Sequence, residues 1–264
     1  MRKALLLIAL FAVTFAEEAA VAASFSTKQV SELSSKAQKG DVQAQHELAL
    51  LYCQEGARQN YKLAADWFKR AADKGFTESM YCLANLYMSG LGVKLNRVEA
   101  IKWYRKAASK GHLECKNILG MMYEVGDEVS YDTEEAARLF EEAASQGHAG
   151  AQGNLARILF YGAEEVEPDP QAAYYWATQA SENGDPQGQF MLGIMYQSGR
   201  GVEQDKAAAV SCFYEAASQG YTEAQYRLGL AYKNGDGVNR DLDAAKYWLE
   251  LAAEQGHSEA ASEL

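Results

Sequence analysis

Three of the four histidines could bind a metal ion or move a proton near neutral pH. These residues, His112, His148 and His257, each follow directly after a glycine that closes a recurring Ala-Ala-x-x-Gly ending. They therefore occupy equivalent positions of a repeat, which stacking separates by about two helix diameters, too far to share one ion. We expect these histidines to lie in water-exposed turns, and we predict no metal site and no cofactor.

Four cysteines offer thiol chemistry, but they fall at four different positions of the repeat: Cys53, Cys82, Cys115 and Cys212. A framework with one disulfide per repeat is therefore absent. Cys82 and Cys115 differ by about one helical turn and are the single candidate pair for a bridge between neighbouring repeats. Cys212 occupies a position that holds tryptophan in most repeats, so we expect it to be buried.

Gly-x-Gly occurs in three loops, 89–93, 198–202 and 234–238, where it could suggest a phosphate-binding turn. Each pair of glycines follows a predicted helix instead of joining a strand to a helix, so the dinucleotide-binding context is missing. The acidic stretch 234–243 also fails the spacing of a calcium loop. No catalytic residue is predicted.

Composition narrows the class of protein and of partner. The chain has 264 residues, 48% of them apolar, and only three prolines, and its apolar residues recur at helical spacing, which predicts an all-α protein. The formal net charge of −11 argues against nucleic acid or anionic lipid as a partner and favours a neutral or basic protein surface.

The first residues have the features of a secretory signal peptide. Arg2 and Lys3 precede the apolar run 4–16, and Ala20-Val21-Ala22 offers a cleavage site. We therefore expect a signal peptide over residues 1–22, cleaved near Ala22, and a secreted or periplasmic protein without membrane insertion after cleavage. An uncleaved membrane anchor is the alternative, although the apolar run is shorter than a spanning helix requires.

An internal repeat of about 36 residues organises the rest of the chain. It is marked by closing glycines at positions 75, 111, 147, 184, 220 and 256. The sequence predicts an N-terminal capping helix over 24–40, and then, over 41–264, six repeats and a short C-terminal stub. The repeats span about 41–75, 76–111, 112–147, 148–184, 185–220 and 221–256.

Each repeat predicts two helices, A and B, which cannot bury their apolar faces alone and must stack on their neighbours into one continuous core. Helix A carries a small residue, then Leu and Tyr at i, i+4 spacing, and helix B carries Trp and Ala-Ala before the closing glycine. An Asp or Asn is suited to capping helix B in most repeats: Asn96, Asp132, Asp169, Asp205 and Asp241. The predicted aromatic core is Tyr52, Trp67, Tyr87, Trp103, Tyr123, Trp176, Tyr196, Tyr232 and Trp248.

The pattern Ala-x-x-x-Leu-Gly-x-x-Tyr, then Gly-x-Gly-Val, then Trp-x-x-x-Ala-Ala-x-x-Gly resembles the SEL-one-like repeat family, a relative of the tetratricopeptide repeat. The range 224–256 matches this pattern nearly throughout, and the resemblance covers roughly residues 41–260. It implies an α/α superhelix, a right-handed solenoid of helix-turn-helix repeats, that acts as a scaffold or adaptor for proteins. The first repeat lacks the Gly-x-Gly-Val loop, and the fourth has a longer, acidic loop over 160–170.

Two other functions accompany this resemblance. Cysteine-rich members of the family are described as β-lactam-binding proteins or weak β-lactamases. Here no serine is followed three residues later by lysine, and no Lys-Thr-Gly occurs, so the parts of a serine β-lactamase are missing and we predict that the chain is not an enzyme. The second alternative is an adaptor in the lumen of the eukaryotic secretory pathway.

In tetratricopeptide-like stacks helix A lines the concave side. By this likeness, the third, seventh and tenth residues of each helix A would face a bound protein or peptide, and large side chains and arginine concentrate binding energy at interfaces. Packing between helices is the alternative for the aromatic residues at the third position. The predicted binding residues are Tyr81, Asn85, Met88, Asn117, Glu124, Arg157, Phe160, Phe190, Gln197, Tyr226 and Lys233.

Overall fold

The computed structural model describes residues 26–54 and 59–264, which form helices in an unbroken alternation of predicted A and B elements. The signal peptide expected over 1–22, the start of the expected capping helix at 24–25, and the centre of the first repeat's loop lie outside the described residues. The described chain divides into two compact units, one ending at Leu119 and one beginning at Gly120. Below they are called the N-terminal and the C-terminal unit.

The N-terminal unit contains a B-type helix followed by two complete A–B pairs. Its helices are α2 (Thr27–Gln38), α3 (Val42–Cys53), α4 (Tyr61–Asp73), α5 (Thr77–Ser89) and α6 (Arg97–Ser109), and α7 (Leu113–Val125) contains the boundary. Leu33 and Ala37 of α2 pack on Ala44, Leu48 and Leu51 of α3. The helix α2 therefore covers the first repeat on one side.

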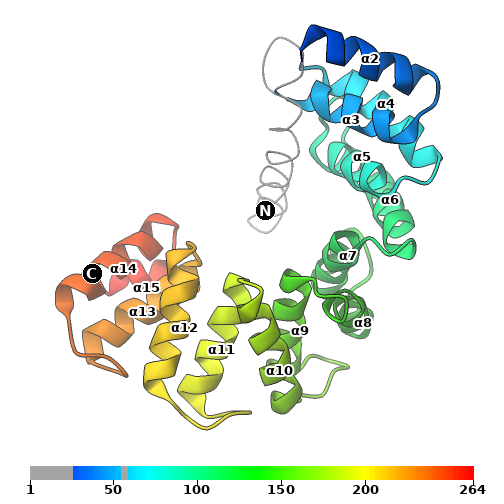
Figure 1. Ribbon diagram of the computed structural model, residues 1–264. Coiled ribbons are helices and arrows are strands. Elements are labelled where there is room, and N and C mark those ends of the chain that lie inside the picture. The colour runs from blue at the N-terminus through cyan, green and yellow to red at the C-terminus, as the bar shows by residue number, and fades with distance from the viewer. Residues whose placement is uncertain (1–25, 55–58) are drawn as a thin grey trace. The chain divides into compact units, whose positions relative to one another are not determined.

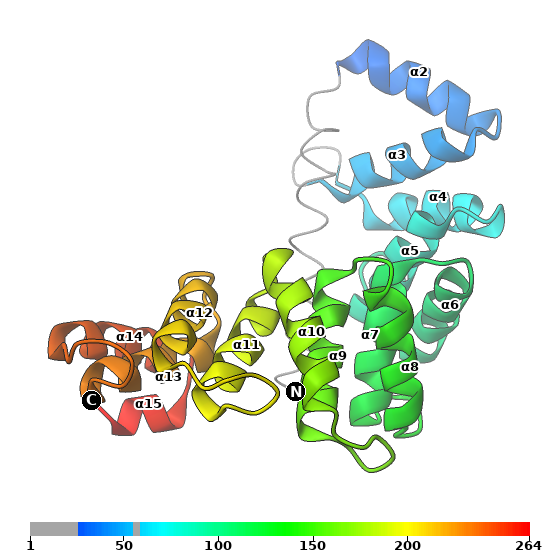
Figure 2. The same ribbon diagram turned by 60° about the horizontal axis from the view of Figure 1, so that its bottom comes forward.

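The C-terminal unit continues the same alternation. Its helices are α8 (Thr133–Ala144), α9 (Ala149–Tyr161), α10 (Pro170–Glu182), α11 (Pro186–Ser198), α12 (Lys206–Ser218), α13 (Thr222–Asn234), α14 (Leu242–Glu254) and the short α15 (Ser258–Ser262). Figures 1 and 2 show α9 to α14 as neighbouring helices, each packed against the one before it in the chain.

The predicted caps of helix B are confirmed. The side chains of Asn96, Asp132, Asp169, Asp205 and Asp241 accept hydrogen bonds from the first-turn backbone, and Asn60 does the same in the first repeat. The backbone N–H of each cap also donates to a carbonyl near the end of the preceding helix A, as from Asn96 to Tyr87 at 2.9 Å. Each cap therefore begins helix B and ties it to its helix A.

The closing glycines end the B helices by adopting positive φ. At Gly75, with φ of 95°, the glycine N–H donates to the carbonyl of Ala72 at 2.9 Å, and the next N–H, of Phe76, donates to Ala71 at 3.2 Å. A side chain would make this backbone conformation costly, which explains why glycine recurs at the position.

The predicted aromatic columns lie at the edge of the core. Among their tryptophans only Trp103 is fully buried, whereas Trp67, Trp176 and Trp248 and the tyrosines of helix A are half-buried. The most buried column of helix B lies one residue later and holds Phe68, Tyr104, Phe140, Ala177, Phe213 and Leu249. Residues of this column lie four positions before the second residue of the Ala-Ala pair. Both positions therefore share one helical face, and this face packs on the core.

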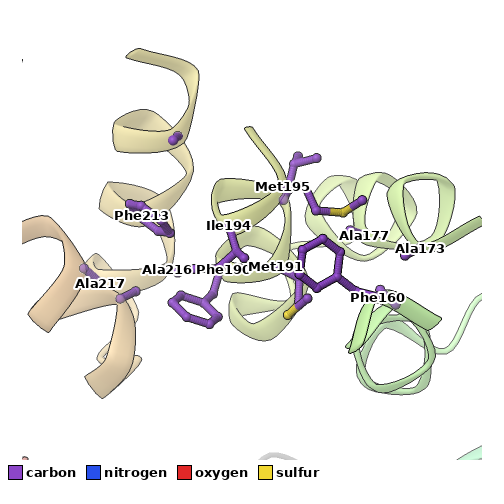
Figure 3. Packing of buried hydrophobic residues seen from close by; sticks show 14 of the residues in the cluster. Phe160, Ala173, Ala177, Phe190, Met191, Ile194, Met195, Phe213, Ala216 and Ala217 are labelled. Carbon is purple, nitrogen blue, oxygen red and sulfur yellow. The ribbon is translucent and has the colours of Figure 1, made fainter. Parts of the chain in front are cut away.

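Within the C-terminal unit one large cluster of buried residues joins α9, α10, α11, α12 and α13. Figure 3 shows Met195 directed from α11 toward α10 and the Phe160 ring between α9 and α11, while Phe190 and Phe213 lie between α11 and α12. The apolar side chains of consecutive repeats therefore pack together, because a single helix pair cannot bury its own apolar face.

Side-chain amides link consecutive repeats beside this apolar packing. The buried Gln152 of α9 donates to the carbonyl of Ala144 at 3.1 Å and accepts from Asn183 at 2.9 Å. Gln225 of α13 makes the same two bonds, to Ala217 at 3.2 Å and from Gln255 at 2.8 Å. We call this series the amide ladder. It satisfies the buried amides of Gln152 and Gln225 and connects α9 and α13 to the B helices on both sides.

Candidate partner-binding surface

The structure places four of the predicted binding residues in the interior. Asn85, Asn117, Phe160 and Phe190 are 4–8% exposed. The Tyr104 hydroxyl donates to Asn85 Oδ1, and Phe160 and Phe190 belong to the core cluster of the C-terminal unit. Helix A is packed between neighbours, so some of its third, seventh and tenth positions point into those contacts. These four side chains pack the repeats together, and we exclude them from the candidate surface.

The other predicted residues remain partly exposed. In the N-terminal unit they are Tyr81 and Met88, and in the C-terminal unit they are Glu124, Arg157, Gln197, Tyr226 and Lys233. We call these seven residues the helix-A surface, described separately in each unit.

Two ion pairs order the charged residues of this surface in the C-terminal unit. Arg157 Nη2 lies 2.6 Å from Glu124 Oε2, with both side chains less than one-third exposed. Lys233 Nζ lies 2.9 Å from Glu263 Oε2 and donates to the Glu263 backbone carbonyl. The paired side chains are held in place, and Arg157 retains further N–H donors with which it can meet a carboxylate or carbonyl of a partner.

The tyrosines of the helix-A surface stack on histidines that follow closing glycines. The rings of Tyr81 and His112 are 5.1 Å apart at an angle of 27°, and those of Tyr226 and His257 are 4.4 Å apart at 29°. Each histidine Nδ1 also accepts a backbone N–H at the start of the next helix A. The expectation of water-exposed turn histidines is therefore wrong, because the imidazole rings cap helices and join repeats.

His148 caps α9 in the same way, through Nδ1 and the N–H of Ala151 at 3.1 Å. Asp185 holds the equivalent position before α11 and accepts from the N–H of Gly188 at 2.7 Å. Burial raises the pKa of Asp185 to about 6. A Cβ at Gly153 would lie 2.3 Å from the Asp185 carboxylate, so glycine at this third position leaves room for that carboxylate.

Tyr221 lies beside this group of polar residues, where burial raises its pKa to about 12 although the nearby Arg157 opposes the shift. Its ring meets Phe190 at 5.2 Å. The phenol therefore stays neutral at physiological pH, and its O–H is a hydrogen-bond group next to the Arg157–Glu124 pair.

The cysteines do not provide a reactive centre. All four are free thiols; Cys53, Cys82 and Cys115 are buried, whereas Cys212, for which we expected burial, is partly exposed. The candidate Cys82–Cys115 bridge is not formed. Burial raises the pKa of Cys53 to about 12 and that of Cys115 further, which disfavours the thiolate that nucleophilic chemistry requires.

The Gly-x-Gly loops are explained by packing. A Cβ at Gly92 would lie 2.2 Å from the backbone of Tyr61, and one at Gly237 would lie 2.2 Å from the carbonyl oxygen of Lys206. In each case the second glycine meets the first residue of the preceding repeat's helix B. The glycines therefore permit close contact between repeats and do not form a phosphate-binding turn.

In the part of the chain that the structure describes, no group of three or more His, Cys, Asp or Glu side chains is arranged to hold a metal ion. No helix there combines the length and the apolar character that crossing a bilayer requires.

Sequence reasoning missed a second set of exposed residues, the tyrosines on the B helices of the C-terminal unit. Tyr175, Tyr214 and Tyr247 are each more than half exposed. Tyr175 and Tyr247 stand directly before the tryptophans at 176 and 248, so aligning the repeats by tryptophan would have revealed them.

These features define an all-α protein built as a solenoid of helix-turn-helix repeats. The Sel1 repeat model matches residues 42–76, 77–112, 114–148, 149–185, 186–221 and 222–257. The chain therefore belongs to the Sel1 repeat family, whose members are generally scaffolds for protein interaction.

Solved structures support this assignment. A protective antigen of uropathogenic Escherichia coli with an SLR fold is 35% identical, with a TM-score of 0.76, over 88% of this chain and 50% of its own. This chain thus spans about half the length of that antigen. A Sel1 repeat protein from Oxalobacter formigenes is 27% identical, with a TM-score of 0.75, over 93% of this chain and 96% of its own.

An immunity protein from Pseudomonas aeruginosa shares the fold, with 19% identity and a TM-score of 0.53 over 82% of each chain. No curated protein sequence matches the chain.

Proposed function

We propose that this protein is a non-catalytic scaffold that binds a protein or peptide through its helix-A surface, in a secreted or periplasmic setting. The Arg157–Glu124 pair carries the proposal. It joins the tenth residue of one helix A to the seventh residue of the next, so that an ordered charged group lies on successive repeats. The amino-terminal sequence 1–22 supports the secreted setting.

The chemistry of the surface favours an extended polypeptide. Arg157 and Lys233 supply N–H donors, Gln197 supplies an amide, and Tyr226 supplies an aromatic ring with a hydroxyl. Such side chains recognise main-chain carbonyls and the side chains of an extended segment, and arginine and tyrosine are enriched among residues that dominate interface energies. The repeat provides their regular spacing, while the residues that vary provide specificity.

Site-specific photocrosslinking in the native host tests the proposal. A photoreactive residue would replace Tyr81, Met88 or Gln197, which are partly exposed members of this surface. Exposed residues of the B helices α4 and α8, Lys62 and Glu134, give matched controls. We expect one protein to be captured from the helix-A positions and not from the controls.

Arg157→Ala then provides the functional check. We expect it to reduce that capture at least tenfold without loss of helical content, because two charge-assisted contacts are worth about 1.5–3 kcal/mol each. Capture at the control positions alone, or equal capture by the Arg157→Ala variant, would contradict binding on this surface.

A further inference from the structure

Tryptophans on the B helices of the N-terminal unit carry cations from their own chain. Arg70 Cζ lies 4.4 Å from the ring centroid of Trp67, and Lys106 Nζ lies 4.0 Å from that of Trp103. Each cation stands three residues after its tryptophan, so both lie on the same helical face. The contacts are cation–π interactions, in which the negative ring face attracts the charge.

The C-terminal unit keeps the tryptophans but has no cation at that position. Three residues after Trp176 and Trp248 stand Gln179 and Leu251. Nowhere in residues 120–264 does the structure place a lysine or arginine over these two rings.

The B helices α10, α12 and α14 also have few positive charges with which to fill the position. Their sequences contain only Lys206 and Lys246. Lys206 pairs with Asp236 at 2.9 Å, and Lys246 lies 3.7 Å from Glu250. Neither of these two lysines is placed over a tryptophan.

Exposed tyrosines surround these two tryptophans. Tyr175, Tyr214 and Tyr247 are 56%, 52% and 56% exposed. Tyr175 contacts Trp176 with ring centroids 4.9 Å apart, and Trp248 contacts Tyr247 at 5.0 Å and Tyr214 of the preceding repeat at 5.9 Å. We call Tyr175, Trp176, Tyr214, Tyr247 and Trp248 the aromatic surface. Large exposed aromatic side chains in one region of a soluble protein indicate an interaction site.

Charge complementarity identifies the class of partner. Residues 120–264 contain 8 Lys and Arg against 25 Asp and Glu, a formal charge of −17, whereas residues 23–119 contain 15 against 9, a charge of +6. Exposed carboxylates stand close to the rings in sequence, at Glu215 after Tyr214 and at Glu250 two residues after Trp248. A basic segment would gain both long-range attraction and ring contacts at this surface.

We propose that the aromatic surface binds a segment of a partner protein that is rich in lysine and arginine. The partner's cations take the places over the rings that Arg70 and Lys106 occupy within the N-terminal unit. This surface lies on the B helices, so the proposal does not depend on the helix-A surface and can hold if that one fails.

A fluorescein-labelled ten-residue peptide of alternating Arg and Gly is a direct probe, with an alternating Glu and Gly peptide as its acidic control. Binding to the full chain would be measured by fluorescence anisotropy at 150 mM salt. We expect the basic peptide alone to bind. The double variant Tyr214→Ser/Tyr247→Ser should weaken its binding about tenfold, because it removes the two exposed rings that contact Trp248 and would flank the bound cation. Tyr131→Ser, a 54% exposed tyrosine of the same unit outside the surface, is the matched control and should bind as the parent does.

A second pair of variants restores the cations within the chain. Gln179→Arg/Leu251→Arg places arginine at the register of Arg70 and Lys106, and it should weaken peptide binding about tenfold by occupying both tryptophans. Ser130→Arg/Gln146→Arg adds the same charge at exposed positions of the same unit that lie on none of these three B helices, and it should change binding less than twofold. Circular dichroism confirms that each variant is folded.

The proposal is overturned if the basic peptide does not bind. It is also overturned if the tyrosine variant binds as the parent does, or if Ser130→Arg/Gln146→Arg weakens binding as much as Gln179→Arg/Leu251→Arg. Either of the last two results would mean that net charge alone attracts the peptide.

Discussion

At the scale of single residues, His46 shows how burial converts a potential ligand into a structural group. Its ring lies 5.5 Å from that of Phe68 and 5.0 Å from that of Phe76, and Nδ1 lies 2.9 Å from Ser79 Oγ. Burial lowers the pKa of His46 to about 4, although the nearby Glu78 raises it. The imidazole is therefore neutral at physiological pH.

This shift predicts an acid-sensitive N-terminal unit. The folded-state pKa lies below the unfolded value of about 6.5, so the stabilisation is present above pH 6.5 and is lost as the pH falls toward 4. We expect His46→Gln, which does not titrate, to remove about 3 kcal/mol of the pH dependence of the unfolding free energy between pH 7.5 and 4. Urea unfolding followed by circular dichroism at both pH values measures this difference. Identical pH dependence in parent and variant would contradict a buried neutral imidazole.

At the scale of the helices, the sequence predicts the order and ends of the elements well because caps and glycines act locally. Asn96 and Gly75, for example, satisfy backbone groups within a few residues of themselves. Which side chains are most deeply buried depends on contacts with neighbouring repeats. The spacing of residues within one repeat therefore predicted the wrong column of helix B as the most buried. Trp67 and Phe68 are adjacent, both are apolar, and only the packing of α4 against α3 and α5 decides that Phe68 is the buried one.

The same limit applies to the candidate site. The third, seventh and tenth positions of helix A hold partly exposed residues such as Arg157 and also buried residues such as Phe190. The aromatic contacts made by residues that follow four of the closing glycines, as between Tyr226 and His257, join positions about 30 residues apart. A single repeat does not reveal such contacts, because they form only when repeats stack.

Phe68 and Trp67 permit a direct comparison on one helix. Phe68 is 0% exposed, and Phe68→Ala should lower the free energy of unfolding by about 3–5 kcal/mol because it leaves a cavity. Trp67 is half-buried under Arg70, and Trp67→Ala should cost about half as much. Chemical denaturation followed by circular dichroism compares the two variants. A larger loss for Trp67→Ala would show that the tryptophan column is the main support of the repeat.

At the scale of the whole molecule, charge is divided unequally along the chain. A formal charge of +6 over 23–119 and −17 over 120–264 means that the net value of −11 describes neither part. The sequence-based preference for a basic partner therefore applies to the C-terminal unit, while the B helices α4 and α6 carry seven of the 15 basic residues over 23–119. Partners of opposite charge can be accommodated by the two parts.

The secreted setting is also tested at this scale. We expect the full chain expressed in a Gram-negative bacterium to be recovered from the periplasm or medium with Ala23 as its first residue, because the segment 1–22 has the charge and length of a cleaved signal. Intact-mass spectrometry of each cell fraction measures this. An Ala22→Tyr variant, which disrupts the small-residue site, should retain the leader. Uncleaved protein in the soluble cytoplasmic fraction would contradict the expectation.

The amide ladder has a consequence for how such a chain can change in length. Gln152 and Gln225 each donate to a carbonyl of the preceding B helix and accept from a side-chain amide at the end of the following B helix. The same two bonds can therefore form again only at an equivalent position of another repeat. Gene duplication or loss of a complete 36-residue segment keeps Gln152 and Gln225 at the same place in the repeat, between two B helices. Gain or loss of a few codons inside a helix leaves buried amides unmatched, so descendants of this chain should differ by entire modules.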